Sequence, residues 1–270
     1  MKAEYCIYSG DLLRTDNALT TSATGMCSGY CFVEEMHAAE NRIFFFEEHL
    51  RQISLNMDLL EIPLPSPLQK DGMEFHRLVA RLLNKNRFYM GAVVKLYITE
   101  SSWGVEVSPL PDRSYTLDLE GISVDLYDRM TKCAHPLSTS HAGSASIWDM
   151  AVRHARKVGV DTCLIRNSNG VMCEAASANL FALTDDVLIT SSLGCGVYHD
   201  VIREKIMQAA RMADLQVQSV DDLFFEQLVL SHEIFIASAS VGIKWIKALR
   251  ERRYYCKRIK DINNCLNELV

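Results

Sequence analysis

The clearest pattern of hydrophobic and polar positions lies in the middle of the chain, between residues 141 and 183. Its first part carries mostly apolar residues at helical spacing: Ile147, Ala151, His154, Ala155 and Val158. Gly159 follows, and glycine most readily takes the left-handed conformation that ends a helix. The pattern therefore predicts a helix that stops at Gly159.

Two strands joined by a tight turn are expected next. Residues 162–166 and 171–174 are short apolar runs, and Asn167-Ser168-Asn169-Gly170 separates them. Because asparagine and glycine tolerate positive φ, this is the chemistry of a hairpin turn. We expect residues 179–183 to continue the same sheet.

The rest of the chain also alternates between strand and helix patterns. Strands are expected at 5–8, 29–36, 42–46, 91–99, 188–190 and 233–236, a turn at 38–41, and helices over 46–62, 73–83 and 220–229. Pro109 and Pro111, followed by Asp112 and Arg113, mark a linker. We therefore expect a small α/β domain over residues 1–113 and a larger α/β domain over residues 114–270.

Composition and charge limit the classes of function. The chain has 270 residues and a formal charge of −6, so neither nucleic acid nor an anionic membrane is expected as its main partner. No apolar run approaches the roughly 20 residues of a membrane-spanning helix, and the start lacks the core of a signal peptide. Nine cysteines without zinc-site spacing indicate reduced, mostly buried residues and no metal site. A cytoplasmic protein is expected.

The central stretch resembles the signature of the class IV aminotransferases. These fold type IV enzymes use pyridoxal 5′-phosphate (PLP) and include branched-chain aminotransferases, D-amino acid aminotransferases and aminodeoxychorismate lyase. The matching residues are Ala151, Gly159, Asp161, Leu164, Gly170, Val171, Glu174, Ser177, Asn179 and Phe181. The resemblance implies a two-domain α/β (α+β) fold with a small N-terminal domain and a barrel-like C-terminal domain. It also implies PLP in the crevice between them, and a homodimer.

The same resemblance locates the positions that would contact PLP. Glu174 takes the position of the carboxylate that partners the pyridine nitrogen. His141 takes the position of the lysine that holds the cofactor as a Schiff base, and an imidazole can move a proton but cannot form the imine. Gln52 takes the position of the arginine that binds the phosphate.

The phosphate loops of the family pattern fall on two further segments. In the first, Asp200 stands at the glycine and Ile202 at the threonine, beside Val201. Asp200 suits the N-cap of a helix, but it places a negative charge where a phosphate dianion would sit. The second loop contains Ser240. The sequence therefore predicts a degenerate PLP site.

Lys95 is the candidate for a replacement Schiff-base amine. It lies in the expected strand 91–99, where GAVVKLYITES resembles the corresponding strand of aminodeoxychorismate lyase. In the family this lysine is not the catalytic one. A strand lysine is also commonly a surface residue.

Three hypotheses remain. In the favoured one, the chain is a class IV aminotransferase-like protein that is not a competent transaminase and binds a small-molecule ligand in its interdomain crevice or a partner. In the second, it is an active PLP-dependent aminotransferase or lyase that acts on an amino acid or an amino-chorismate, with Lys95 or another lysine, or with His141 as base. In the third, His141 and Glu174 form an acid/base pair that works without PLP.

Overall fold

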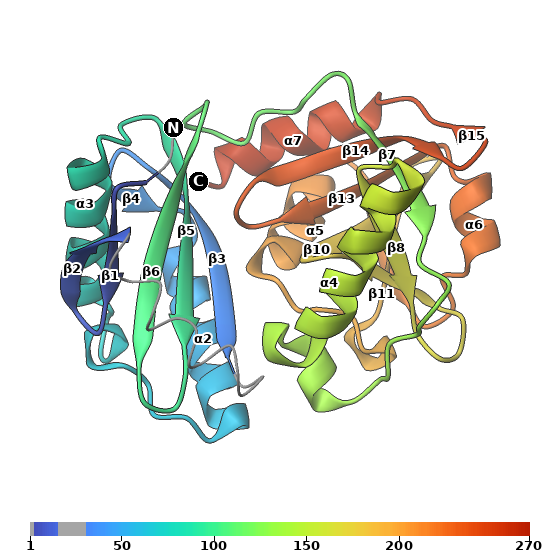
Figure 1. The fold of residues 1–270 in the computed structure, drawn as a ribbon. Coiled ribbons are helices and arrows are strands. Elements are labelled where there is room, and N and C mark those ends of the chain that lie inside the picture. The colour runs from blue at the N-terminus through green and yellow to red at the C-terminus, as the bar shows by residue number, and fades with distance from the viewer. Residues whose placement is uncertain (1–2, 16–30) are drawn as a thin grey trace. The chain divides into compact units, whose positions relative to one another are not determined.

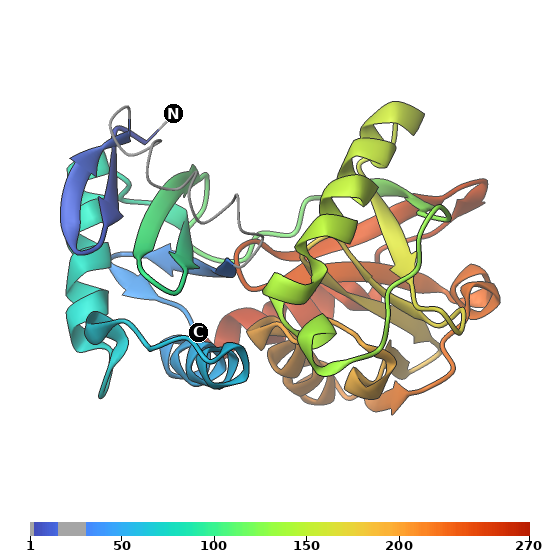
Figure 2. The same ribbon diagram turned by 60° about the horizontal axis from the view of Figure 1, so that its bottom comes forward.

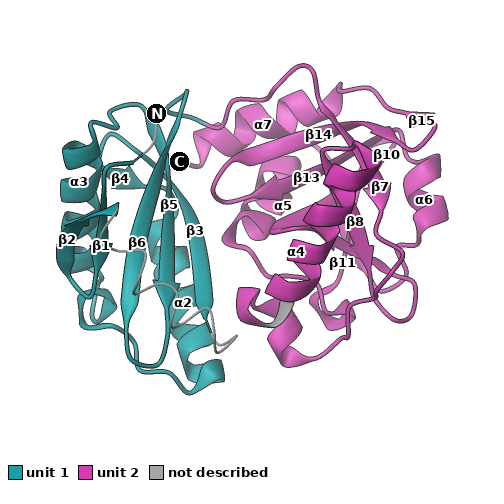
Figure 3. Cartoon of the chain, viewed as in Figure 1, with its two compact units in different colours: residues 1–114 teal, residues 115–270 magenta. Residues whose placement is uncertain are grey.

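The computed structural model describes residues 3–15 and 31–270. The chain divides into two units, residues 1–114 and 115–270, which Figure 3 draws in separate colours. The linker pattern places the boundary after residue 113.

The first unit is built on an antiparallel sheet whose described strands follow the order β2-β1-β6-β5-β3-β4. The strands are β1 (Tyr5–Tyr8), β2 (Asp11–Arg14), β3 (Phe32–Ala39), β4 (Arg42–Ile43), β5 (Gly91–Ile98) and β6 (Trp103–Leu110). Two helices accompany them, α2 (Phe46–Leu60) and α3 (Met73–Asn86), with the short 3-10 turn η1 (Ser66–Leu68) between them. Helix α2 packs on β3, and α3 packs on β1, β4 and β6 (Figure 1).

The second unit contains a sheet that closes on itself. Strand β10 pairs with β13 on one side and with β9 on the other, and the path β13-β14-β7-β8-β9 completes the ring. The ring strands are β7 (Ile122–Leu126), β8 (Thr162–Arg166), β9 (Met172–Ala175), β10 (Ala178–Thr184), β13 (Glu233–Ser238) and β14 (Gly242–Leu249). Strands β11 (Val187–Ser191) and β12 (Gln216–Val220) extend it from β10, and β15 (Arg252–Arg253) pairs with β14. This is the barrel-like domain that the resemblance implies, so that prediction is confirmed.

The described part of this unit also contains four helices and two 3-10 turns. They are α4 (His141–Val158), α5 (Val201–Met212), α6 (Phe225–Leu230), α7 (Arg258–Glu268), η2 (Pro136–Thr139) and η3 (Leu193–Cys195). Figure 2 shows the same ribbon from a second direction. Alternate residues of the ring strands, among them Leu164, Leu180 and Ile234, form one apolar cluster. Burying this cluster fixes the face that each strand presents. The opposite face is therefore left to residues such as Glu174 and Asn179.

The central stretch folds as its sequence predicts. Helix α4 ends at Gly159, which takes φ 78° in the left-handed region. Strands β8 and β9 flank the predicted turn and pair antiparallel. Within that turn Asn167 Oδ1 accepts hydrogen bonds from the backbone N–H groups of Asn169 and Val171. The asparagine side chain thus makes the turn that its chemistry favours.

Several expected boundaries are wrong. The strand expected at 42–46 ends at Ile43, because Phe45 takes a left-handed conformation (φ 51°) and Phe46 begins α2. The helix expected over 220–229 begins only at Phe225, because Val220 still pairs with Ser191 in the parallel β11–β12 ladder. Strand β3 runs on through Ala39 into a turn of two positive-φ residues. Gly29 lies outside the described residues.

The described residues include no helix long and apolar enough to cross a membrane. Among them there is also no group of three or more His, Cys, Asp or Glu side chains placed to hold a metal ion.

Gly242 and Gly159 provide a matched test of the packing in the second unit. Both take positive φ, +74° and +78°, but an added Cβ would come 2.6 Å from Tyr115 at Gly242 and would meet nothing within 4 Å at Gly159. We expect Gly242→Ala to lower the free energy of unfolding by about 1–3 kcal/mol more than Gly159→Ala, since only the former adds a clash to the backbone strain. Urea unfolding measures both. Equal losses would contradict the placement of Tyr115.

Candidate functional site

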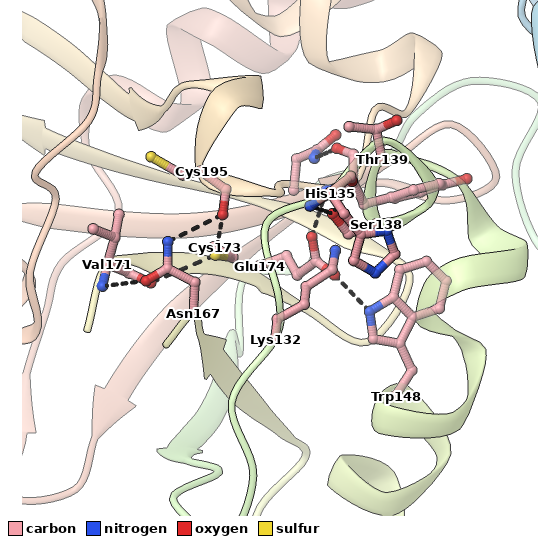
Figure 4. Close-up of polar contacts among 12 residues, drawn as sticks. Lys132, His135, Ser138, Thr139, Trp148, Asn167, Val171, Cys173, Glu174 and Cys195 are labelled. Atoms are coloured by element: carbon pink, nitrogen blue, oxygen red, sulfur yellow. Dashed lines mark hydrogen bonds and ion pairs between the residues drawn. The ribbon is translucent and has the colours of Figure 1, made fainter. Parts of the chain in front are cut away.

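The candidate site is built around Glu174, a fully buried carboxylate on β9. Its Oε1 accepts hydrogen bonds from Lys132 Nζ at 2.6 Å and from Trp148 Nε1 at 2.7 Å (Figure 4). Its Oε2 accepts one from the backbone N–H of Tyr198 at 2.5 Å. The three donors come from the segment before η2, from helix α4 and from the segment before α5. One carboxylate therefore joins three segments that are far apart in the sequence.

Lys132 is buried, with 4% of its surface exposed. Its backbone is fixed beside the turn after β8: its N–H donates to the carbonyl of Arg166, and its own carbonyl accepts from the N–H of Ser168. The side chain then forms an ion pair with Glu174 inside the unit. A buried pair of this kind depends on both partners, because either charge alone would be left without compensation.

The turn before β9 helps to hold Glu174 in place. Asn167 Nδ2 donates to the carbonyl of Cys195, which ties the turn to η3. Cys173, next to Glu174 in sequence, donates to the same carbonyl. Burial and the neighbouring Glu174 charge raise the pKa of the Cys173 thiol to about 12. This cysteine is therefore a packed, unreactive thiol at neutral pH.

An aromatic cluster covers the ion pair. The Trp148 ring packs edge-on against the rings of His141 and Tyr198, with centroids 4.9 Å apart in both cases. Lys132 Nζ lies 5.9 Å from the centre of the Trp148 ring. His141 is the first residue of α4, next to the N-cap Ser140. Trp148 therefore contacts both His141 and Glu174.

The two predicted phosphate loops meet at Asp200. Its Oδ1 accepts a hydrogen bond from the N–H of Ile202 in the first turn of α5, and its Oδ2 accepts one from the N–H of Ala239, each at 3.1 Å. Asp200 is buried and caps α5, as its sequence position predicts. Val201 is also buried in this helix. In the other loop the hydroxyls of Ser238 and Ser240 lie 3.3 Å apart.

Arg203 attaches α5 to the sheet. This residue is 2% exposed, and its guanidinium donates to Thr190 Oγ1, to the carbonyl of Ser191 and to Ser219 Oγ. Burial lowers the pKa of this guanidinium. Burial likewise lowers the pKa of His199, which keeps the imidazole neutral. The hydrogen bonds of Arg203 hold the first turn of α5 at a fixed place in the unit.

The remaining predicted site residues belong to the first unit. Gln52 lies on the buried face of α2. On the same face His49 Nδ1 lies 2.6 Å from Glu34 Oε1. Lys95, on β5, pairs with Glu35 at 3.0 Å, and both side chains are partly exposed. Its role as a Schiff-base amine stays a prediction.

No pattern in the sequence singles out Lys132 as a site residue. It stands on the irregular segment between β7 and η2, nine residues before His141, where no hydrophobic period fixes the register. One signal was available: this lysine lies between a strand and the helix on which the family pattern places its own lysine. The pattern fixes positions along α4 and β8, but it cannot show where a side chain from a preceding loop will point.

Comparisons with known proteins identify the family and the fold. The family model described as "Amino-transferase class IV" matches residues 32–249. The branched-chain-amino-acid aminotransferase of Salmonella typhimurium is 21% identical over 272 residues, which covers 92% of this chain and 85% of that protein.

Two solved structures share the fold at low identity. A branched-chain aminotransferase from Thermoproteus uzoniensis, solved with norvaline, superimposes with a TM-score of 0.82 at 17% identity over 98% of this chain and 94% of that one. A putative 4-amino-4-deoxychorismate lyase from Legionella pneumophila gives 0.76 at 17% identity over 91% and 93%.

The energetic role of the buried pair can be measured directly. We expect Lys132→Met to lower the free energy of unfolding by about 3–5 kcal/mol, because it leaves the Glu174 carboxylate buried without its cation. The double variant Lys132→Met/Glu174→Gln should lose less than the single one. Lys95→Met is the control, since its partly exposed pair with Glu35 should contribute roughly 0–1 kcal/mol. Equal losses for Lys132→Met and Lys95→Met in urea unfolding would contradict a buried ion pair.

Proposed function

Because the chain belongs to the class IV aminotransferase family, we propose that it keeps the family fold but has given up PLP chemistry, and that it acts as a ligand- or partner-binding protein. The observation that carries this proposal is the ion pair between Lys132 and Glu174. The proposal includes a homodimer, which the family resemblance implies. Light scattering measures this oligomeric state.

The surroundings of Glu174 are a poor fit to the pyridine ring of PLP. In the family the carboxylate accepts a hydrogen bond from the protonated ring nitrogen. Here Lys132 and Trp148 already donate to Oε1, and the N–H of Tyr198 donates to Oε2. A ring nitrogen directed at Oε1 would have to displace Trp148 or the ammonium group of Lys132, whose charge-assisted bond is at least as strong. A displaced ammonium, buried with Lys132, would then need a new partner.

The residues at the predicted phosphate loops fit the phosphate group of PLP no better. The carboxylate of Asp200 already accepts from the N–H groups of both loops. A phosphate placed within about 4 Å of this carboxylate would be disfavoured by several kcal/mol. Gln52 adds no positive charge where the family pattern has arginine. The groups that would hold the phosphate are therefore engaged or neutral, and a ligand without a phosphate is favoured.

The position of the family lysine supports the same conclusion. His141 carries no primary amine, so it cannot bind the cofactor covalently. The third hypothesis, an acid/base pair of His141 and Glu174, is also disfavoured. The Glu174 carboxylate is already engaged by Lys132, by Trp148 and by the N–H of Tyr198.

The position of Lys132 beside Glu174 favours a second candidate function. This lysine supplies a primary amine in contact with Glu174, whereas Lys95 is engaged with Glu35 in the first unit. If Lys132 leaves the carboxylate when PLP binds, it could take the covalent role that the family gives to its lysine. The chain would then be an active PLP-dependent aminotransferase or lyase.

Covalent labelling with PLP separates the two candidates. The protein is mixed with PLP, reduced with borohydride and analysed by absorbance, intact mass and peptide mapping. Lys132→Arg is the matched variant, because arginine keeps a cation beside Glu174 but cannot form an imine. We expect no one-to-one adduct in the wild-type protein and the same weak background in Lys132→Arg.

A one-to-one adduct at Lys132 that disappears in Lys132→Arg would establish the second candidate. A one-to-one adduct at Lys95 would equally overturn the proposal and would support the lysine that the sequence suggested. The variant Lys95→Arg then serves as the corresponding check.

A further inference from the structure

Two backbone N–H groups from distant parts of the chain converge on one buried side chain. The N–H of Ile202 belongs to the first turn of α5, and that of Ala239 to the loop between β13 and β14. Both point to Asp200, whose two carboxylate oxygens accept them at 3.1 Å. Asp200 is 6% exposed, and Ile202 and Ala239 are 0% exposed. Water therefore cannot readily replace this carboxylate as the acceptor.

The groups around the Asp200 carboxylate favour an anion at this position. The first N–H groups of a helix lack intrahelical acceptors, and the helix dipole favours negative charge beside them. Ala239 is fixed on its other side as well, because the Tyr115 hydroxyl donates to its carbonyl at 2.7 Å. Burial, followed by the nearby Asp200 charge, raises the pKa of Tyr115 well above its ordinary value. Tyr115 therefore remains a neutral hydroxyl donor.

Tyr115 also holds the second loop in shape. Its ring lies where a side chain at position 242 would be, so only glycine fits there. Its backbone is tied to α7, since its N–H donates to Asn267 and its carbonyl accepts from Asn263 and Asn267. These contacts therefore fix the position of the Ala239 N–H, whichever acceptor it bonds to.

We propose that Asp200 is an internal substitute for a phosphate ligand: its carboxylate occupies the acceptor position between the two loops and keeps them assembled with no bound anion. The proposal extends the proposed function, since it explains how the unit remains ordered without a cofactor. It is nevertheless tested separately, because it concerns the binding of an anion and not the formation of an imine. Its consequence is that removing the carboxylate opens a site for inorganic phosphate.

The test compares Asp200→Gly with the wild-type protein in thermal denaturation, in sodium phosphate and in sodium chloride of equal ionic strength at one pH. Ser140→Gly is the control, because Ser140 also caps a helix through its side chain, which accepts from the N–H of Ala142. We expect the wild-type Tm to be the same in both salts. Both variants should melt at lower temperature in chloride, and only Asp200→Gly should regain several degrees in phosphate.

A second variant covers a failure to fold. Asp200→Asn keeps one oxygen acceptor and removes the charge, so it should fold with a lower Tm and respond to phosphate less than Asp200→Gly. If Asp200→Gly folds only when phosphate is present, as seen by circular dichroism, the proposal is supported.

Three outcomes would overturn the proposal. One is a phosphate response of the wild-type protein equal to that of Asp200→Gly. Another is a folded Asp200→Gly with no response. The last is an Asp200→Gly that is unfolded in both salts while Asp200→Asn folds without any response. A PLP adduct at Lys132 would refute the proposed function but would leave these melting results unchanged, so the two failures can be distinguished.

Discussion

The second unit depends on the buried carboxylate of Glu174 and on the three donors that converge on it. Lys132, Trp148 and the N–H of Tyr198 come from segments that no continuous helix or strand connects. Because an ionised group inside a protein is stable only when it is paired and hydrogen-bonded, these segments must lie where they do. Under the proposed function, this ion pair takes the place of a contact for which the family uses a cofactor.

At the phosphate loops we propose the corresponding replacement, with a charge of the opposite sign. A cation, Lys132, meets the carboxylate of β9, and an anion, Asp200, meets the N–H groups at the start of α5 and in the β13–β14 loop. PLP carries a protonated ring nitrogen and a phosphate, so a site that binds it must offer a negative group to one and N–H donors to the other. Here both kinds of group are already matched by side chains. The fold is that of the class IV aminotransferases, and we propose that these internal contacts take the place of contacts to a cofactor.

The sequence predicts those features whose physics is local. Helix α4 follows from its apolar spacing and from Gly159, and the turn before β9 follows from asparagine and glycine. Asp200 is recognisable as an N-cap because the cap depends on residues two positions apart. The family pattern in turn identifies Glu174, and the closed barrel that it implies is observed.

What the sequence does not show depends on contacts between distant segments. Lys132 lies on a loop without periodicity, and its meeting with Glu174 requires the whole ring of strands to close first. The helix expected at Val220 fails for a similar reason, because pairing with β11 outweighs the local preference. The second bond of Asp200, to Ala239, joins residues 39 positions apart and is equally invisible to local rules.

The central claim is that side chains of this chain occupy the positions that PLP would need. A crystal structure of the protein grown with excess PLP tests it most directly. The account predicts Lys132 Nζ within hydrogen-bond distance of Glu174, and Asp200 bonded to the N–H groups of Ile202 and Ala239, with no cofactor density between them. Density for PLP joined to Lys132, with its ring nitrogen on Glu174, would contradict the account and would identify the protein as a working PLP enzyme.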